Sequence, residues 1–591
     1  MLSDSPDPFY YLANFERALA WLGARCADLF DDAERRFAAT FPLLPRSARA
    51  LFVRMLMRKG PHFRASRLDY AEIGCPRAAA AALVAAGWLD GAPALDFETL
   101  AALVTKAELQ ALAARLELAP EAHAARATRA ATLGALTAHL CGSTAATGVR
   151  DWHAWFPASA DTVWHFKAAP LCERLRLMFF GNLRQDWREF VLADLGVFRY
   201  ETVAFDAASR AFQHRGDIDT WLALRDCRET LEAAIADEAP IVPPIETALA
   251  TLDALAARTH ANPWLRERHD KLRHAAGLAA ERAREPELAW RAYAGSAHAE
   301  SRYRRVRVLE QLDRREEAVA LARAIAAAPA NEEEAQRAAR TLGRLTRARR
   351  AASPVAPGFA NLELVLPAAP HGVRVEEAAR RALATPDAPV FYVENTLINA
   401  LFGLLCWPAL FAPLPGAFFH PFQRGPADLH AADFAARRAA HFDACLAELE
   451  SGAYRDSILR RYAEKNGVQA PFVAWGALND TLLALALDCF PAAHLRLWFE
   501  RLLREPVANR SGLPDLVRFR PMNPSDGQTG ERRYELIEVK GPGDRLQDNQ
   551  RRWLAYCAAH GMAVTVLHVR WPESVEPPSG AALETGHAGA P

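Results

Sequence analysis

The residues YELIEVKG (534–541) have the composition of a β-strand, and the segments around them predict a small α/β domain. A second strand candidate, LPDLVRFR (513–520), precedes them, and the two are joined by the turn-rich connector NPSDGQTGERR. After them come the amphipathic helix DRLQDNQRRWLAYCAAHG (544–561), which ends in a glycine, and the β-branched run AVTVLHV (563–569). With an apolar helix expected earlier in the chain, the order helix, strand, strand, helix, strand indicates an α/β domain attached to a mainly helical remainder.

Two acids and a lysine lie on the two central strand candidates. Glu538 and Lys540 are two residues apart, so the alternation of side chains along a strand puts them on the same face. Asp515 follows Pro514 in the other strand, and pairing of the two strands as a hairpin makes it a cross-strand neighbour of Glu538. The order P-D…E-x-K resembles the motif of the PD-(D/E)XK nucleases.

These residues suit a divalent cation. Carboxylate oxygens and a backbone carbonyl, here that of Val539, are hard ligands of the kind that Mg²⁺ and Mn²⁺ prefer. Such an ion lowers the pKa of a bound water and stabilises the charge that develops on a phosphoryl group. A lysine beside that water can position or deprotonate it. The pattern therefore predicts a site that hydrolyses phosphodiester bonds.

A plainer interpretation of the same residues is an acid at a strand end and an exposed ion pair on an edge strand. The composition weighs against it for Lys540. Because only six of the 71 basic residues are lysines, simple surface charge at this position would more often be arginine. A lysine on an apolar strand, between Glu538 and Gly541, is more natural where the chemistry needs an amine.

Length and composition bound the remaining possibilities. A chain of 591 residues is too long for a single core and predicts roughly three to five domains. With 51% hydrophobic and 24% charged residues, the composition excludes disordered and fibrous classes. Lys plus Arg and Asp plus Glu are equal at 71 each, which excludes a uniformly basic protein that coats nucleic acid but leaves room for local basic patches.

The nine cysteines are scattered singly, and no C-x-x-C pair occurs among them. This argues against a zinc ribbon, and the odd number argues against a secreted disulfide framework. The N-terminal sequence MLSDSPDPFYYL lacks the basic head and apolar run of a signal peptide. We therefore expect a reducing, cytoplasmic location, associated with the nucleoid.

The stretch Asn395–Gln423 contains no charged residue and is long enough in principle to span a bilayer. Four prolines interrupt it, so the helical part reaches only from about Thr396 to Trp407. A dozen apolar residues ended by proline predict a helix buried in a protein core, and we expect no membrane-spanning segment.

The first 350 residues are helical in pattern. Arg46–Tyr70 holds seven basic residues against one acid, which is either a solvated helix face or a patch that faces phosphates. Within residues 98–140, TLAALVTKAELQALAARLEL and TRAATLGALTAHL predict two amphipathic helices around an irregular linker, as in SAP DNA-binding modules. Residues 287–334 resemble one tetratricopeptide unit within a degenerate helical-repeat region. RRAASPVAPG (349–358) is the best linker candidate.

The catalytic segments resemble a known nuclease family. The VRR-NUC domain, a branch of the PD-(D/E)XK superfamily, is similar to GLPDLV (512–517), IEVKGPGDRLQDNQRRWL (537–554) and VTVLHV (564–569). More narrowly, the Fanconi-associated nuclease family is similar to ENTLINALFGLLCW (394–407), FVAWGALND (472–480) and SGLPDL (511–516). RKGPHFRASRLDYAEI (58–73), the SAP-like hairpin and the helical repeats follow in that family's order, and the composition favours a bacterial member.

This resemblance implies a structure-specific DNA nuclease that depends on Mg²⁺ or Mn²⁺. The family cuts 5′ flaps endonucleolytically, degrades DNA from 5′ to 3′ and acts in DNA repair, including repair of interstrand crosslinks. Carried over by motif, Asp515, Glu538 and Glu394, with the Val539 carbonyl, are metal ligands, and Lys540 is the catalytic lysine. Further positions that the resemblance implies are Gln550 in the catalytic site, Asp544 close to the DNA, and Arg64, Arg67 and Lys106 as phosphate contacts.

The expected partner is branched or 5′-flap DNA, bound by a monomer or a weak dimer. The sequence offers no Cys/His spacing for the ubiquitin-binding zinc finger of larger family members. Two alternatives stay open: a four-way junction resolvase of the VRR-NUC type, and a non-catalytic adaptor with a decayed nuclease core, against which the presence of all four site residues argues.

The fold class that follows is a mostly α-helical multidomain protein with a C-terminal α/β restriction-endonuclease-like domain. We expect four parts: an N-terminal helical DNA-binding domain at 1–95, a SAP-like module at 96–145, a helical TPR-like domain at 146–355, and a VRR-NUC nuclease domain at 356–591 with its catalytic core at about 390–575.

Overall fold

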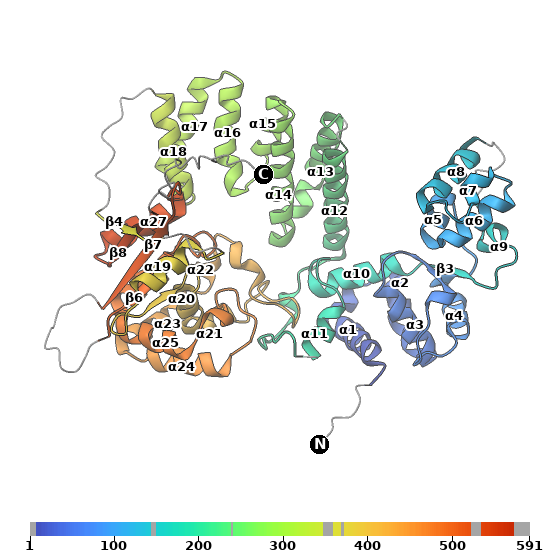
Figure 1. The fold of residues 1–591 in the computed structure, drawn as a ribbon, viewed down its shortest axis with the longest axis horizontal. Helices are drawn as coiled ribbons and strands as arrows, with labels where there is room; N and C mark the ends of the chain where they lie inside the picture. The colour runs from blue at the N-terminus through green and yellow to red at the C-terminus, as the bar shows by residue number, and fades with distance from the viewer. Residues whose placement is uncertain are drawn as a thin grey trace, which may run out of the picture. The chain divides into compact units, whose positions relative to one another are not determined.

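The computed structural model describes residues 7–142, 149–194, 196–237, 240–346, 358–367, 372–521 and 533–571. The chain forms two compact units, and both are mainly helical (Figure 1). The first unit comprises residues 1–276 together with 413–423, and the second comprises 277–412 together with 424–591. The predicted linker at 349–358 and the connector between the two central strands lie almost entirely outside the described residues.

The first unit begins with helices packed around aromatic side chains. Its opening helices are α1 (Tyr10–Cys26), α2 (Asp32–Thr40), α3 (Arg46–Leu56) and α4 (Pro76–Ala85). Phe15, Phe37, Phe41 and Phe52 lie in mutual ring contact between them. A small antiparallel sheet completes this part in the order β1-β3-β2, formed by His62–Arg64, Val163–Phe166 and Leu89–Asp90.

The SAP-like stretch contains more helices than its sequence predicts. They are α5 (Phe97–Leu103), α6 (Lys106–Arg115), α7 (Pro120–His123) and α8 (Arg129–Gly142). The first predicted helix is broken at Thr105, whose hydroxyl accepts the Glu108 N–H while the Glu108 carboxylate accepts the Thr105 N–H. This capping box starts a new helix where apolar periodicity alone predicts continuation.

The remaining helices of the first unit are α9 (Trp152–Trp155), α10 (Ala169–Phe180), α11 (Arg188–Asp194), α12 (Arg215–Ala236), α13 (Val242–His260) and α14 (Pro263–Arg282). The last three are long, and α14 continues into the second unit. Residues 413–423 return to this unit from far along the chain. Phe419 lies 5.2 Å from the ring of Trp264, and the buried His420 lies 4.9 Å from that of Phe180. Most of the uncharged stretch is therefore buried, although Pro408, Pro413 and Pro415 are exposed, and its second half belongs to the first unit.

After the end of α14, the second unit continues with four helices, α15 (Pro286–Ala294), α16 (Ala299–Gln311), α17 (Arg315–Ala327) and α18 (Glu332–Leu345). α16 and α17 form the helix pair expected in the tetratricopeptide-like segment, and Val306, Leu309 and Ala322 share its apolar core. α17 ends two residues before Pro329, and Asn331 caps the next helix by accepting the Glu334 N–H at 2.7 Å.

The C-terminal part of the second unit is a five-stranded mixed sheet with the strand order β4-β8-β7-β6-β5. The strands are β4 (Ala360–Val365), β5 (Val390–Tyr392), β6 (Leu516–Phe519), β7 (Tyr534–Lys540) and β8 (Val564–Arg570). β4, β8 and β7 are parallel, whereas β5 and β6 are antiparallel to their neighbours. Strands β6, β7 and β8 are the predicted ones, and β4 and β5 are additional.

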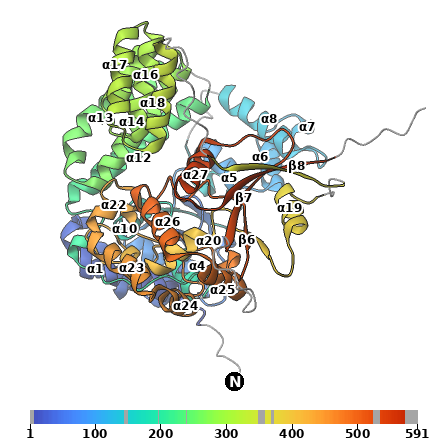
Figure 2. The same cartoon turned by 90° about the vertical axis from the view of Figure 1, so that its left-hand side faces the viewer.

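Helices cover both faces of this sheet (Figure 2). They are α19 (Val375–Leu383), α20 (Leu397–Leu405), α21 (Trp407–Leu410), α22 (Phe434–Arg437), α23 (Ala439–Ser451), α24 (Tyr454–Glu464), α25 (Asp480–Cys489), α26 (Ala492–Arg504) and α27 (Asp548–Ala559). α19 packs its Ala379 against Ile537 and Val539 on one face, while Tyr534 meets Phe490 and Trp498 on the other.

Two predicted helices differ in extent from the sequence-based bounds. α20 is buried along its whole length, as predicted, but ends at Leu405, and a short separate helix holds Trp407 and Pro408. α27 begins at Asp548 rather than at Asp544, because the Gly541–Gly543 turn and the Gln547 cap precede it. No single helix in the described ranges is long and apolar enough to cross a membrane, and one bent pair, α25 with α26, passes that test by length and composition alone.

Candidate active site

The pairing of β6 with β7 brings Asp515 to Glu538. Leu516 pairs with Ile537, so Asp515 and Glu538 are the next residues along the same antiparallel register. The Val539 N–H donates to the Asp515 carboxylate at 2.8 Å, which fixes this carboxylate against β7. The Val393 N–H donates to the Asp515 carbonyl at 2.8 Å and attaches the end of β5 at the same point. The predicted hairpin neighbours are therefore neighbours in the structure.

Lys540 and Glu538 share one face of β7, as their spacing predicts. The Lys540 Nζ donates to Glu538 Oε1 at 2.5 Å. Both side chains are buried, with Glu538 at 0% and Lys540 at 8% exposure. An exposed surface pair on an edge strand is thereby excluded, because β7 lies between β6 and β8 in the interior of the sheet.

The pKa values of the Asp515 and Glu538 carboxyl groups are raised above their ordinary range. Burial, opposed by the Val539 N–H and Lys540, raises the pKa of Asp515 to about 6. Burial and the charge of Asp515 raise the pKa of Glu538 to about 7, with Lys540 opposing the shift. Glu538 Oε2 is buried and has no hydrogen-bond partner among the described residues. A single lysine does not balance two buried acids, and a buried acceptor without a partner is costly.

Glu394 lies close to these acids, in the turn between β5 and α20. Its charge raises the pKa of both Asp515 and Glu538, although its own oxygens accept from the Tyr392 hydroxyl and from Asn395 Nδ2. Asn395 adopts a left-handed backbone conformation with φ +51°, and its Oδ1 accepts the Leu513 N–H at 3.1 Å. This contact ties the turn that carries Glu394 to the segment that enters β6.

The oxygen atoms of this site are of the kind that bind a divalent cation, but the carboxylates are not all turned toward one point. Two buried carboxylates, an orphaned carboxylate oxygen and the Val539 carbonyl are hard oxygen ligands, and a cation would relieve the repulsion between the acids. Each carboxylate is nonetheless turned to a different donor: Asp515 to Val539, Glu538 to Lys540 and Glu394 to Tyr392. Within the described part of the chain, no group of three or more His, Cys, Asp or Glu residues is gathered closely enough to hold a metal ion.

Two further predicted residues stabilise local structure next to the site. The Asp544 carboxylate accepts the Gly541 N–H at 3.0 Å and closes the turn after β7. Gln550 Oε1 accepts the Gln547 N–H at 2.9 Å in the capping box of α27. These contacts position the segment that follows Lys540, and the roles of both residues toward DNA stay predictions.

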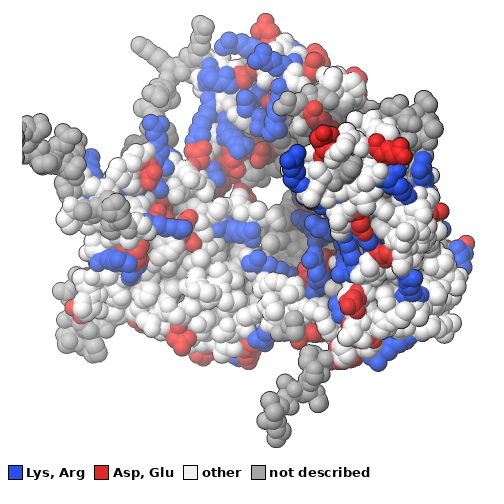
Figure 3. Space-filling model, turned by 45° about the vertical axis from the view of Figure 1, so that its right-hand side comes forward, with Lys and Arg blue, Asp and Glu red and all other residues white. Residues whose placement is uncertain are grey.

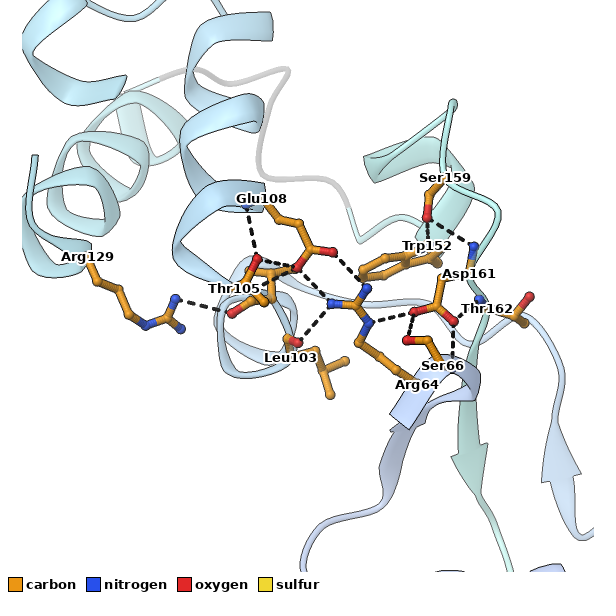
Figure 4. Close-up of polar contacts among 11 residues, drawn as sticks. Arg64, Ser66, Leu103, Thr105, Glu108, Arg129, Trp152, Ser159, Asp161 and Thr162 are labelled. Carbon is orange, nitrogen blue, oxygen red and sulfur yellow. Dashed lines mark hydrogen bonds and ion pairs between the residues drawn. The ribbon is translucent and has the colours of Figure 1, made fainter. Parts of the chain in front are cut away.

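Arg64 has a different environment from the one that a phosphate contact requires. Its guanidinium donates to both oxygens of Glu108 at 2.7 Å and to Asp161 at 2.8 Å, and it lies 4.7 Å from the ring of Trp152 (Figure 4). We call Arg64, Glu108, Asp161 and Trp152 the Arg64 cluster. The residue is 9% exposed, and its charge is already balanced by two acids, so its evident role is to join three distant segments.

The other two predicted phosphate contacts are exposed. Arg67 forms no ion pair among the described residues, and Lys106 Nζ donates to the Ala125 carbonyl at 3.2 Å. Figure 3 shows basic and acidic side chains interspersed over the face drawn, rather than a uniform basic coat, in keeping with the neutral net charge. Arg67 and Lys106 thus remain available to an anion, whereas Arg64 does not.

Sequence reasoning missed the residues that position Glu394. Tyr392 donates its hydroxyl to Glu394, and Asn395 holds the turn against Leu513. The signal was present in the sequence VFYVEN (390–395), a short apolar strand followed by an acid and an asparagine, but three residues are too few for periodicity to identify a strand.

Comparisons with known proteins agree with this geometry. Residues 9–90 match the family model "FAN1, HTH domain", and residues 449–571 match the model "VRR-NUC domain". A Fanconi-associated nuclease 1 homolog of Pseudomonas aeruginosa is 48% identical over 571 residues, which cover 96% of each chain. A homolog of the same name from Oryza sativa is 25% identical over 95% of this chain and 63% of its own length. A crystal structure described as paFAN1 bound to 2nt 5′flap DNA with gap superposes with a TM-score of 0.85, at 48% identity and over 96% of this chain and 99% of that one.

Proposed function

Because the chain belongs to the Fanconi-associated nuclease family, we propose that Asp515, Glu538 and Lys540 hydrolyse phosphodiester bonds of branched DNA with the help of a divalent metal ion. The family makes the protein a structure-specific nuclease of the VRR-NUC type with a role in DNA repair. The similarity to a nuclease described as bound to 5′-flap DNA supports the 5′ flap as the preferred substrate. Exonucleolytic degradation from 5′ to 3′ and action on interstrand crosslinks complete the proposal.

Asp515, Glu538 and the Val539 carbonyl would hold the ion, with Glu394 as a further carboxylate ligand, and Mg²⁺ or Mn²⁺ suits these oxygens. When bound, such an ion supplies a water of lowered pKa and positive charge over the phosphoryl oxygens. The orphaned Glu538 Oε2 is the observation that carries this assignment, because a buried carboxylate oxygen without a donor is rarely left so in a folded protein.

Lys540 has two functions that follow from its position. Its Nζ donates to Glu538 Oε1, which holds this carboxylate in one orientation. The same ammonium is the cation beside the buried acids and can offset the charge of an attacked phosphate or orient the attacking water through its remaining protons. The Val539 N–H holds Asp515 in the same manner, so both acids are oriented by β7 before substrate binds.

A matched pair of variants on β7 tests the proposal. Glu538→Gln should abolish cleavage of an end-labelled 5′-flap duplex in the presence of Mn²⁺ or Mg²⁺. Glu535→Gln is the control, because Glu535 lies on the opposite face of the same strand, paired with Arg518 and Thr565, and should cleave like the wild type. Equal cleavage by Glu538→Gln and the wild type would discard the assignment.

A four-way junction run in parallel, with symmetrical cuts as its readout, distinguishes resolution of junctions from cutting of flaps.

We also propose the four-part division of the chain given above, a monomer or weak dimer in solution, and a cytoplasmic location. The location is supported by the eight cysteines that the structure describes, all of which are free thiols. Arg67 and Lys106 are proposed as phosphate contacts on account of their exposure.

A further inference from the structure

The small sheet of the first unit carries two histidines on the face that is turned away from the aromatic core. His62 of β1 is the register partner of His165 in β3, and Asp90 of β2 pairs with His165 from the other side. Directly paired residues of an antiparallel sheet point to the same face, so these three side chains form one row across the sheet. The opposite face is buried and holds Phe63, Leu89, Trp164 and Phe166. We call His62 and His165 the histidine pair.

The two imidazole rings of the histidine pair are in direct contact. His165 Nδ1 lies 3.1 Å from His62 Nε2, and the ring centroids are 4.6 Å apart, with the ring planes tilted by 48°. The two nitrogens therefore face each other at an angle rather than head-on, so their lone pairs can meet at one point. An ion with metal–nitrogen bonds of about 2.0 to 2.1 Å separates two ligand nitrogens by about 2.9 Å at a right angle and by about 3.3 Å at the tetrahedral angle. The observed separation lies between these two values.

The histidine pair can direct two lone pairs toward one ion. Both rings are half-buried, and the described residues offer neither ring a hydrogen bond beyond the one that the two rings share. Burial and the neighbouring His165 lower the pKa of His62, against the charge of Asp96, so this ring is neutral at neutral pH. A neutral imidazole holds its single proton on either nitrogen. The proton of the shared hydrogen bond can therefore move to the outer nitrogen of its ring, which leaves both facing nitrogens free to bind a metal ion.

Two acids beside the histidine pair favour a cation. Asp90 is exposed opposite His165, and its Oδ1 accepts the Ala92 N–H at 3.0 Å. Asp96, the N-cap of α5, acts on His62 through its charge. Because no third His, Cys, Asp or Glu of the described residues lies close enough to be a ligand as well, water would fill the other coordination positions. Imidazole nitrogens suit Zn²⁺, Cu²⁺ and Ni²⁺, whereas the oxygen atoms of the active site suit Mg²⁺ and Mn²⁺.

We propose that His62 and His165 together bind a late first-row divalent ion such as Zn²⁺. The ion would link β1 to β3 through two histidines that are 103 residues apart in the chain. The helices α5 to α8 of the SAP-like stretch lie between these strands in the sequence. A link between distant residues restricts the unfolded chain more than a local one does, so the ion is expected to stabilise the base of this stretch. The proposal concerns the other unit from the nuclease residues and does not rest on the function proposed above.

Calorimetric titration of the tag-free, full-length protein with Zn²⁺ tests this proposal, with millimolar Mg²⁺ present to compete at carboxylate sites. His62→Gln and His165→Gln each remove one ligand but keep a polar side chain. His153→Gln is the matched control, because His153 is an exposed histidine of α9 in the same unit and lies outside the histidine pair. Thermal melts of all four proteins without added Zn²⁺ show whether the variants fold.

The wild type and His153→Gln should bind Zn²⁺ at a site that His62→Gln and His165→Gln weaken by about tenfold or more, because the second of two linked ligands acts at a high effective concentration. Zn²⁺ should also raise the melting temperature of the wild type and of His153→Gln, but not that of the two pair variants. Equal Zn²⁺ affinity in the wild type and both pair variants would overturn the proposal, since the contact would then be a hydrogen bond between two histidines and nothing more.

A measurement on the wild type alone decides the question if the pair variants do not fold. The electron paramagnetic resonance spectrum with one equivalent of Cu²⁺ should show coupling to two imidazole nitrogens. A spectrum without that coupling would overturn the proposal.

Discussion

The active site and the Arg64 cluster both bury acids beside one cation, and they differ in whether the charges balance. In the Arg64 cluster, burial tends to raise the pKa of Glu108 and Asp161, but hydrogen bonds from Arg64 and from neighbouring hydroxyl and N–H groups outweigh it and lower both pKa values. In the active site, burial outweighs the hydrogen bonds and the charge of Lys540, so the pKa values of Asp515 and Glu538 are raised. Removing one partner from a balanced buried cluster is costly, whereas buried acids with raised pKa values are typical of functional sites.

The largest expected effect is on catalysis. Asp515→Asn keeps an oxygen that can accept the Val539 N–H but removes the charge that a metal ion requires. We expect the rate of flap cleavage to fall by about a thousandfold or more, because the charge stabilisation of the transition state depends on that ion. Single-turnover cleavage of a labelled flap with saturating enzyme measures the effect. Cleavage within tenfold of the wild type would show that this carboxylate is not part of the catalytic group.

The same substitution in the two clusters should have opposite consequences for stability. Asp161→Asn leaves a buried arginine without one of its two acids and should lower the free energy of unfolding by about 3 kcal/mol. Asp515→Asn removes repulsion from Glu538 and should leave the free energy of unfolding unchanged or higher. Urea unfolding of both variants, compared with the wild type without metal, checks the pair. If both variants lose stability equally, the contrast between the clusters is wrong.

A third buried group, His420, differs from the side chains of both clusters because it is uncharged. Burial lowers the pKa of His420 to about 3, and its Nδ1 accepts the Phe422 N–H at 3.1 Å, so the ring is neutral. The unfolded chain takes up this proton near pH 6.5 and the folded chain only near pH 3, so stability falls as the pH falls between these values. The loss is about 2 kcal/mol at a pH of about 5. Unfolding curves at pH 7 and 5 should show it in the wild type, and His420→Gln should show a smaller difference.

The smallest expected effect concerns Thr105, the N-cap of α6, which is the helix that carries Glu108 of the Arg64 cluster. Thr105→Ala removes the hydroxyl that accepts the Glu108 N–H and donates to its carboxylate at 2.9 Å. A lost N-cap costs about 1 kcal/mol. The change should lower the melting temperature by a few degrees while flap cleavage stays at the wild-type level. Thr137→Ala, at an exposed hydroxyl within α8 that only donates to the carbonyl of Leu133, is the control and should melt close to the wild type.

The sequence predicts the local part of this molecule well. Period-two alternation puts Glu538 and Lys540 on one face, and the composition of β6, β7 and β8 identifies them as strands. What it misses depends on contacts between distant segments. β4 is largely exposed and β5 has three residues, so neither carries a periodic signal, and the partners of Arg64 include Asp161, which lies almost a hundred residues away. A basic residue in a charge run is therefore no guide to nucleic-acid binding until its acids are located.

The return of residues 413–423 to the first unit affects how the protein is made. While the ribosome adds the residues between 276 and 413, the side chains that Phe419 and His420 later cover stay open to water, among them Phe180 and Trp264. At about 5 to 20 residues per second this interval lasts roughly 7 to 27 seconds. The core of the first unit is thus incomplete until residues 413–423 have been synthesised. A fragment that stops at residue 276 lacks this segment altogether.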